Sequence, residues 1–293
     1  MWSKKNFLFL LVYTLLFSAL IFVGRSIFFP DVNYEEQYIE PSLEIEAEYQ
    51  SFSGMTQEDI RSTVHDLIYE EFTKKYTQEE QAKVSFTYFP SELFEKIQHS
   101  YLPLAETFLY HKDVLSRIEN LSILLYKNKS ETRWRMKAKS IHLHGVLNMS
   151  DAEFLWVLIH EFGHYIDIYS LPKSTFWDES QQFYDISWDS VTTIRPDLKG
   201  KDFVSGYAMT NQYEDFAESY VYYVLHNKDF LEKSKESNIL ARKYTFFQKY
   251  IFPRNLFYKE NFSDEAVFKS YYWDITKLPV DIKKFLQYLQ SGI

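Results

Sequence analysis

Apolar residues recur along this chain with two different periods, and the period predicts each element. A helical period runs through residues 150–171, where Ser150 is suited to cap the helix, Glu153 completes a capping box and Pro172 ends the segment. The stripe that predicts this helix consists of Leu155, Leu158, Ile159, Phe162 and Ile166.

Periodicity and turn signals divide the rest of the chain into predicted helices and strands. Helices are predicted over residues 56–76, 91–101, 104–118, 211–226 and 280–289, with one or two more in 228–250. Pro103 is expected to stop the helix of 91–101 and to separate it from the next. Strands are predicted over 83–89, 121–127 and 271–275, and the alternation over 133–146 fits one long strand or a hairpin. No internal repeat and no clear boundary divides residues 56–293. We therefore expect one α+β domain with a small mixed sheet and a helical C-terminal half, whose catalytic core spans about 133–226.

The N-terminus predicts a membrane segment. Residues 7–23 are uncharged and mostly apolar, they follow Lys4 and Lys5, and an acidic stretch comes after them. We expect residues 1–29 to be an uncleaved transmembrane helix, with a cleavable signal segment or a buried helix as alternatives. Residues 30–55 are expected to be an acidic tether. The positive charges before the apolar run and the acidic residues after it predict that the domain lies outside the cytoplasm. It would be attached to the membrane, or secreted if the N-terminal segment is cleaved.

Composition narrows the possible partners. With 46% hydrophobic and 19% aromatic residues, the chain can bury a large core. A net charge of −9 without a basic stripe argues against a nucleic acid partner, and the absence of Cys excludes disulfides and thiolate metal ligands. Oligomeric state is left open.

Candidate chemistry lies in the middle of the helix predicted over 150–171. Residues 160–164 read His-Glu-Phe-Gly-His, an H-E-x-x-H pattern. His160 and His164 are four residues apart and share one helical face, and Glu161 projects about 80° away from them. Two imidazoles can hold one cation while the carboxylate serves as a base, which is typical of zinc hydrolases. Burying these polar groups on an apolar helix without a partner would be costly.

A third ligand has to come from elsewhere. The longer pattern H-E-x-x-H-x-x-G-x-x-H fails, because Asp167 and Ser170 stand at its Gly and second His positions. A carboxylate on the helix of 211–226 is the remaining source, and there Glu214 and Glu218 share one face. Either could reach the metal, and a merely solvated helix face is the alternative. His142 and His144 also share a face, but without a neighbouring acid they are read as surface residues.

Two motifs together resemble a known family. His160-Glu161-Phe-Gly-His164-x-x-Asp167, combined with Tyr207-Ala-Met-Thr-Asn-x-x-Glu214-Asp-Phe-Ala-Glu218, is similar to the zinc peptidase domain of anthrax lethal factor and the bacterial Pro-Pro endopeptidases. The resemblance covers about residues 150–226 and leaves the loop of 170–203 unmatched. It implies a zincin-like (gluzincin) fold, Glu214 as third zinc ligand, and Tyr207 as a hydrogen-bond donor to the reacting carbonyl or leaving group.

These features lead to a functional expectation. The chain is expected to be a zinc-dependent endopeptidase with one Zn²⁺, which hydrolyses extracytoplasmic proteins or peptides through a zinc-bound water with Glu161 as general base. Asp167 and Glu218 are candidates for outer contacts that orient the ligands. The competing hypothesis is a catalytically inactive, metal-stabilised peptide-binding or adhesion module at the cell surface. Cleavage specificity, the natural substrate and the role of residues 228–293 remain open.

Overall fold

The structure is a computed structural model that describes residues 76–91, 93, 97–98, 101–129, 134–174, 177–263 and 278–291. Within this part of the chain, no helix is long and apolar enough to cross a membrane. The predicted membrane segment (1–29), the acidic tether (30–55), the helix of 56–76 except for its last residue, and the strand of 271–275 lie outside the described residues. Most of the predicted helix of 91–101 also lies outside them, since only residues 91, 93, 97, 98 and 101 of this span are described.

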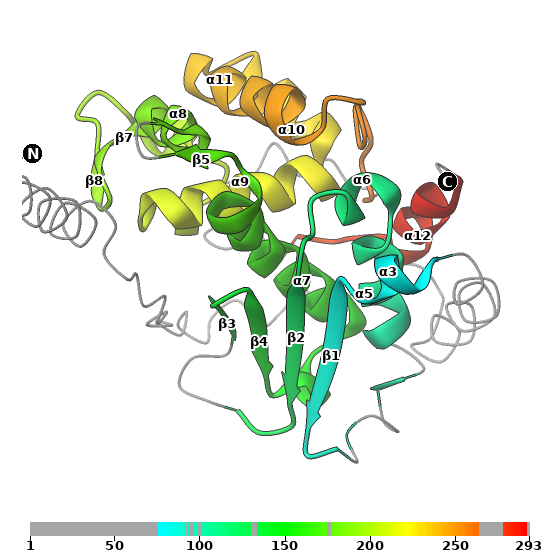
Figure 1. The fold of residues 1–293 in the computed structure, drawn as a ribbon. Coiled ribbons are helices and arrows are strands. Elements are labelled where there is room, and N and C mark those ends of the chain that lie inside the picture. Colours follow the sequence, from blue (N-terminus) through cyan, green and yellow to red (C-terminus); the bar gives the residue numbers. More distant parts are fainter. Residues whose placement is uncertain are drawn as a thin grey trace, which may run out of the picture. The chain divides into compact units, whose positions relative to one another are not determined.

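A four-stranded mixed sheet forms one layer (Figure 1). Its order is β1 (Val84–Phe89), β2 (Leu121–Tyr126), β4 (Ser140–His144) and β3 (Trp134–Lys137), with the first three strands parallel and β3 antiparallel at the edge. Strands β2 and β4 alternate between buried and half-exposed positions, so one face of the sheet is apolar and packs against helices. The α+β class with a small mixed sheet is confirmed.

Residues 133–146 contain a hairpin rather than one long strand. Ala138 and Lys139 connect β3 to β4 with φ values of 50° and 61°, the left-handed pair that a two-residue hairpin turn needs. On the outer sheet face, the Tyr126 ring stacks on His144 at a centroid distance of 4.2 Å and on His142 at 5.9 Å. The two histidines thus pack on a tyrosine ring.

The prediction that Pro103 separates two helices is wrong. Helix α5 (Tyr101–Leu109) includes Pro103 as its third residue. The first four N–H groups of a helix have no acceptor within it, so proline is tolerated there. The single helix predicted over 104–118 is also wrong, because His111 caps a separate short helix, α6 (Lys112–Leu115).

Helices α7 and α9 form the centre of the domain. Helix α7 (Asp151–Tyr165) is capped by Ser150, as predicted, and continues into a π-helical turn, η3 (Ile166–Ser170). Helix α9 (Gln212–Leu225) crosses α7 closely at Gly163, where a Cβ atom would lie 3.0 Å from the Cα atom of Ala217. A glycine therefore allows this close approach, and a larger residue would make one of the two backbones shift by a few tenths of an ångström.

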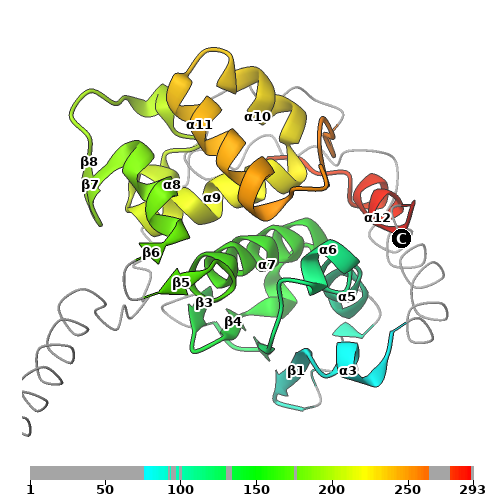
Figure 2. The same ribbon diagram turned by 45° about the horizontal axis from the view of Figure 1, so that its top comes forward.

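The helical C-terminal half contains two helices in residues 228–250 and a last helix, with bounds α10 (Asn227–Ser234), α11 (Asn238–Phe246), the π-helical turn η6 (Phe247–Ile251) and α12 (Ile282–Ser291). Helices α10 and α11 lie on the far side of α9 from α7 (Figure 2), whereas α12 packs against α5. The unmatched loop of 170–203 holds helix α8 (Glu179–Ser187), the short hairpins β5 (Lys173–Ser174) with β6 (Trp177–Asp178) and β7 (Trp188–Ser190) with β8 (Thr193–Ile194), and the 3-10 turn η4 (Gly200–Asp202). Edge-to-face aromatic contacts fill the space between these elements, for example Phe183 with Phe216 and Phe247. They account for much of the high aromatic content.

Replacing Gly163 with alanine should destabilise the protein. Alanine gains about 1 kcal/mol of helix propensity over glycine. Overpacking a rigid contact costs about 1–3 kcal/mol, and the obstructing atoms here are the Cα atom and carbonyl oxygen of Ala217 and the Cβ atom of Tyr220, none of which can rotate away. We expect Gly163→Ala to lower the urea midpoint of unfolding, and Ala217→Gly not to rescue it, because glycine keeps the obstructing Cα and carbonyl oxygen. An unchanged midpoint would show that the two helices have room to separate.

Candidate metal centre

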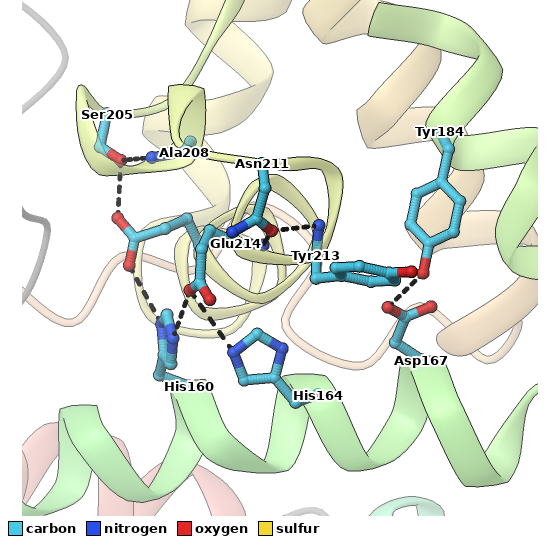
Figure 3. A network of polar contacts seen from close by, with 10 residues as sticks. His160, His164, Asp167, Tyr184, Ser205, Ala208, Asn211, Tyr213 and Glu214 are labelled. Carbon is cyan, nitrogen blue, oxygen red and sulfur yellow. Dashed lines mark hydrogen bonds and ion pairs between the residues drawn. The ribbon is translucent and has the colours of Figure 1, made fainter. Parts of the chain in front are cut away.

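Two capped helices fix the register of the candidate residues. Asn211 is the N-cap of α9, and its Oδ1 accepts hydrogen bonds from the backbone N–H groups of Tyr213 and Glu214 at 2.9 and 3.0 Å. Glu214 therefore lies in the first helical turn, where the helix dipole favours a negative charge. On α7, His160 and His164 lie one turn apart and face α9 (Figure 3).

The structure brings His160, His164 and Glu214 together. Nε2 of His160 lies 3.1 Å from Oε2 of Glu214, and Nε2 of His164 lies 3.4 Å from the same oxygen. One ligand atom from each of the three residues falls within 4.8 Å of the others, and all three side chains are buried. Among the described residues this is the group of His and acidic side chains that could hold a metal ion.

The spacing of these atoms fits a small tetrahedral cation. Metal–ligand bonds of about 2.0–2.1 Å place the ligand atoms of a tetrahedral site about 3.3 Å apart. The two N···O separations of 3.1 and 3.4 Å lie on either side of that value. The Glu214 oxygen therefore already lies at a suitable distance from both imidazole nitrogens to share one ion with them.

Without a metal, protons hold the cluster together. Burial disfavours a charged imidazole, but hydrogen bonds to Glu214 and Glu218 hold the pKa of His160 well above its usual value. Burial likewise opposes ionisation of Glu214, yet His164 and His160 hold the pKa of its carboxyl below the usual range. A bound cation would replace the proton as the charge that compensates the buried carboxylate.

Glu218 contacts the other nitrogen of His160. Its Oε1 lies 3.1 Å from Nδ1 of His160, while its Oε2 accepts a 2.6 Å hydrogen bond from the Ser205 hydroxyl. Ser205 Oγ in turn accepts the backbone N–H of Ala208 at 3.0 Å. A carboxylate on the far nitrogen is the usual device for orienting a metal-binding histidine, because it fixes the tautomer with Nε2 free to coordinate.

Glu161 and Tyr207 flank the cluster. Glu161 is on α7 between the two histidines and is only 1% exposed. Tyr207 begins the 3-10 turn η5 (Tyr207–Met209), and its half-buried ring lies 6.1 Å from the His160 ring, centroid to centroid. Tyr207 thus lies beside a candidate ligand, and Glu161 is buried directly after His160 on α7.

Asp167 faces a different set of neighbours. Its carboxylate accepts a hydrogen bond from the Tyr184 hydroxyl, and its backbone carbonyl accepts one from Ser180, both on α8 (Figure 3). Burial raises the pKa of Asp167, and the nearby Lys173 ammonium group counteracts this in part. Asp167 therefore joins the end of α7 to α8 in the loop of 170–203.

Sequence reasoning missed several residues that hold the site. Ser205, Tyr184 and the buried ion pair between Asp215 and Lys243 form its surroundings. Asp215 belongs to the Glu-Asp-Phe-Ala-Glu segment, and an acidic residue on the inner side of an apolar helix was a signal that a cation would be buried with it. Nothing in the local sequence marked Ser205 or Lys243, because their partners lie 13 and 28 residues away.

Substitution of the two α9 carboxylates should separate their roles. Glu214→Ala removes the carboxylate oxygen that lies near Nε2 of both histidines, so we expect most of the metal affinity to be lost. Glu218→Ala leaves His160 without its Nδ1 partner and should weaken metal binding about 10–100-fold. The measurement is metal stoichiometry after dialysis against a weak chelator, with folding checked by circular dichroism. If Glu218→Ala loses the metal while Glu214→Ala retains it, the third ligand is Glu218.

No family model matches the chain, and neither a curated protein nor a solved structure matches it. The likeness to the lethal factor and Pro-Pro endopeptidase family therefore depends on the two sequence motifs. The structure adds, independently of that likeness, a buried His–His–Glu group that could hold a metal ion.

Proposed function

We propose that this chain is a zinc-dependent endopeptidase. The observation that carries the proposal is the convergence of α7 and α9. Segments about 54 residues apart bring His160, His164 and Glu214 within 4.8 Å of one another, in a buried cluster that Glu161 adjoins. The motif resemblance supports the same conclusion and supplies the expectation of a zincin-like fold.

The donor set favours zinc over other common ions. Two imidazoles and one carboxylate are a ligand set of catalytic zinc sites, whereas Ca²⁺ and Mg²⁺ prefer oxygen ligands throughout. Three buried carboxyl groups, those of Glu161, Glu214 and Glu218, surround only two imidazoles. A divalent cation would balance this excess of buried acid.

The chain has a candidate side chain for each step of peptide hydrolysis. When bound, zinc would supply Lewis acidity and lower the pKa of a coordinated water. The Glu161 carboxylate accepts a proton from the attacking water and returns it to the leaving amine. The Tyr207 hydroxyl donates a hydrogen bond to the oxygen that becomes negatively charged, an interaction commonly worth about 2.7–4 kcal/mol.

The sheet offers a place for an extended substrate. β3 is one of the two edge strands of the described sheet, runs antiparallel to β4 and contacts α7. Main-chain groups on the outer side of an edge strand can pair with an added peptide strand. A polypeptide substrate therefore suits this fold better than a small molecule.

The cellular setting is part of the proposal. Lys4 and Lys5 followed by the apolar run of 7–23 support a membrane-anchored enzyme whose domain lies outside the cytoplasm. Its substrates would then be extracytoplasmic proteins or peptides.

Two conservative substitutions test the catalytic assignment. Glu161→Gln cannot accept the proton and should reduce turnover of a peptide library by about 100-fold or more. Tyr207→Phe removes one hydrogen-bond donor and should reduce turnover by about 100-fold. Neither residue is proposed as a ligand, so both variants should retain one metal ion per chain. Loss of metal in parallel with activity would make the residue a ligand or a structural group, and a metal-loaded wild-type chain that cleaves no peptide would favour a binding module.

A further inference from the structure

Lys243 on α11 is a completely buried cation close to the candidate metal centre. Its Nζ lies 2.7 Å from Oδ2 and 2.8 Å from Oδ1 of Asp215, and 3.3 Å from the backbone carbonyl oxygen of Asp202. It also lies 4.0 Å from the centroid of the Phe203 ring. Lysine is almost never fully buried unless it is paired. The contacts with Asp215, Asp202 and Phe203 therefore stabilise the ammonium group in this buried position.

These contacts reach the two segments that carry candidate site residues. Asp215 follows Glu214 in the first turn of α9, about 100° further round the helix, so that Glu214 faces α7 while Asp215 faces α11. Asp202 ends the turn that leads to Tyr207, five residues later. One ammonium group therefore joins the segment of the third ligand to the segment of the tyrosine.

Asp202 is held by α11 at a second point. Its Oδ1 accepts a 2.6 Å hydrogen bond from Ser237, the N-cap of α11, and its Oδ2 accepts the backbone N–H of Lys199 at 3.0 Å. The carboxylate and the carbonyl of the same residue are thus both bound, the first by Ser237 and the second by Lys243. This leaves the turn little freedom to move away from α11.

The other end of the segment is fixed on α9. The Ser205 hydroxyl donates a hydrogen bond to Glu218 and accepts one from the backbone N–H of Ala208. Ser205 and Ala208, which flank Gly206 and Tyr207, are therefore linked to the carboxylate that contacts His160, Ser205 directly and Ala208 through Ser205. Residues 202–208 are therefore held at Asp202 by α11 and at Ser205 by α9, and Tyr207 lies in this segment between Ser205 and Ala208, whose contacts Figure 3 shows.

We propose that Lys243 is a positioning residue of the candidate site, which fixes the Tyr207 segment relative to the α9 turn that bears Glu214. The proposal rests on the proposed function for its catalytic consequence. It gives the C-terminal helical half a role that its sequence did not reveal, because α11 supplies both the ammonium group and the Ser237 hydroxyl.

The test separates positioning from charge compensation. Lys243→Met keeps the length of the side chain but leaves Asp215 buried without its cation, which destabilises the fold. The double variant Lys243→Met with Asp215→Asn removes the unpaired charge and keeps an acceptor for Trp188, whose Nε1 donates to Asp215. Three quantities are compared in the full chain: the urea midpoint, amide hydrogen exchange over residues 199–211 in the metal-free protein, and kcat and KM on a peptide library.

We expect the double variant to recover the urea midpoint while exchange over 199–211 remains at least about tenfold faster than in the wild type. Its kcat should fall about 10–100-fold with KM little changed. The matched control is Lys235→Met, which breaks an exposed 2.6 Å ion pair with Glu232 and should change none of the three quantities.

Wild-type exchange over residues 199–211 in the double variant would overturn the proposal and leave Lys243 as a charge partner only. The double variant also decides the question if Lys243→Met alone fails to fold. A wild-type chain that cleaves no peptide would contradict the proposed function separately, because the exchange measurement uses metal-free protein and requires no turnover.

Discussion

The close crossing of α7 and α9 is the contact on which the rest of the site depends. The touching faces match: His160, Gly163 and His164 on one helix meet Glu214, Ala217 and Glu218 on the other. Gly163 and Ala217 each come three residues after the first polar residue of their set and one residue before the second, so each lies on the same helical face as the polar residues. Because both central residues are small, the backbones approach until imidazoles and carboxylates are within hydrogen-bond distance. A bulkier pair would separate the ligands from each other.

This close approach buries several carboxylates, and neighbouring side chains compensate their negative charges. Buried carboxylates need compensation, and here it comes from different sources for different acids. Glu214 contacts both histidines, Glu218 contacts His160 and accepts a hydrogen bond from the Ser205 hydroxyl, and Asp215 pairs with the Lys243 ammonium group. The helical C-terminal half therefore supplies charge and hydrogen-bond donors as well as apolar cover for α9.

Local sequence patterns predicted what is local in the structure. The stripe and caps of α7 and α9, the strands of the sheet and the positions of the two histidines follow from periods and caps within about 15 residues. The choice between Glu214 and Glu218 did not follow from spacing, since both share one face, and the motif resemblance chose Glu214. Pro103 was misread because a stop signal and a first-turn position look alike in sequence. The clamp of Ser205 and Lys243 depends on contacts between distant segments, which no periodicity records.

The central claim is that α7 and α9 together form one metal site. X-ray absorption spectroscopy at the zinc edge, on the chain reconstituted with one equivalent of Zn²⁺, tests it most directly. The account predicts a first shell of two imidazole nitrogens and oxygen ligands at about 2.0–2.1 Å, and loss of one imidazole in a His164→Ala variant. A shell of oxygen ligands alone, or an unchanged spectrum in that variant, would contradict it.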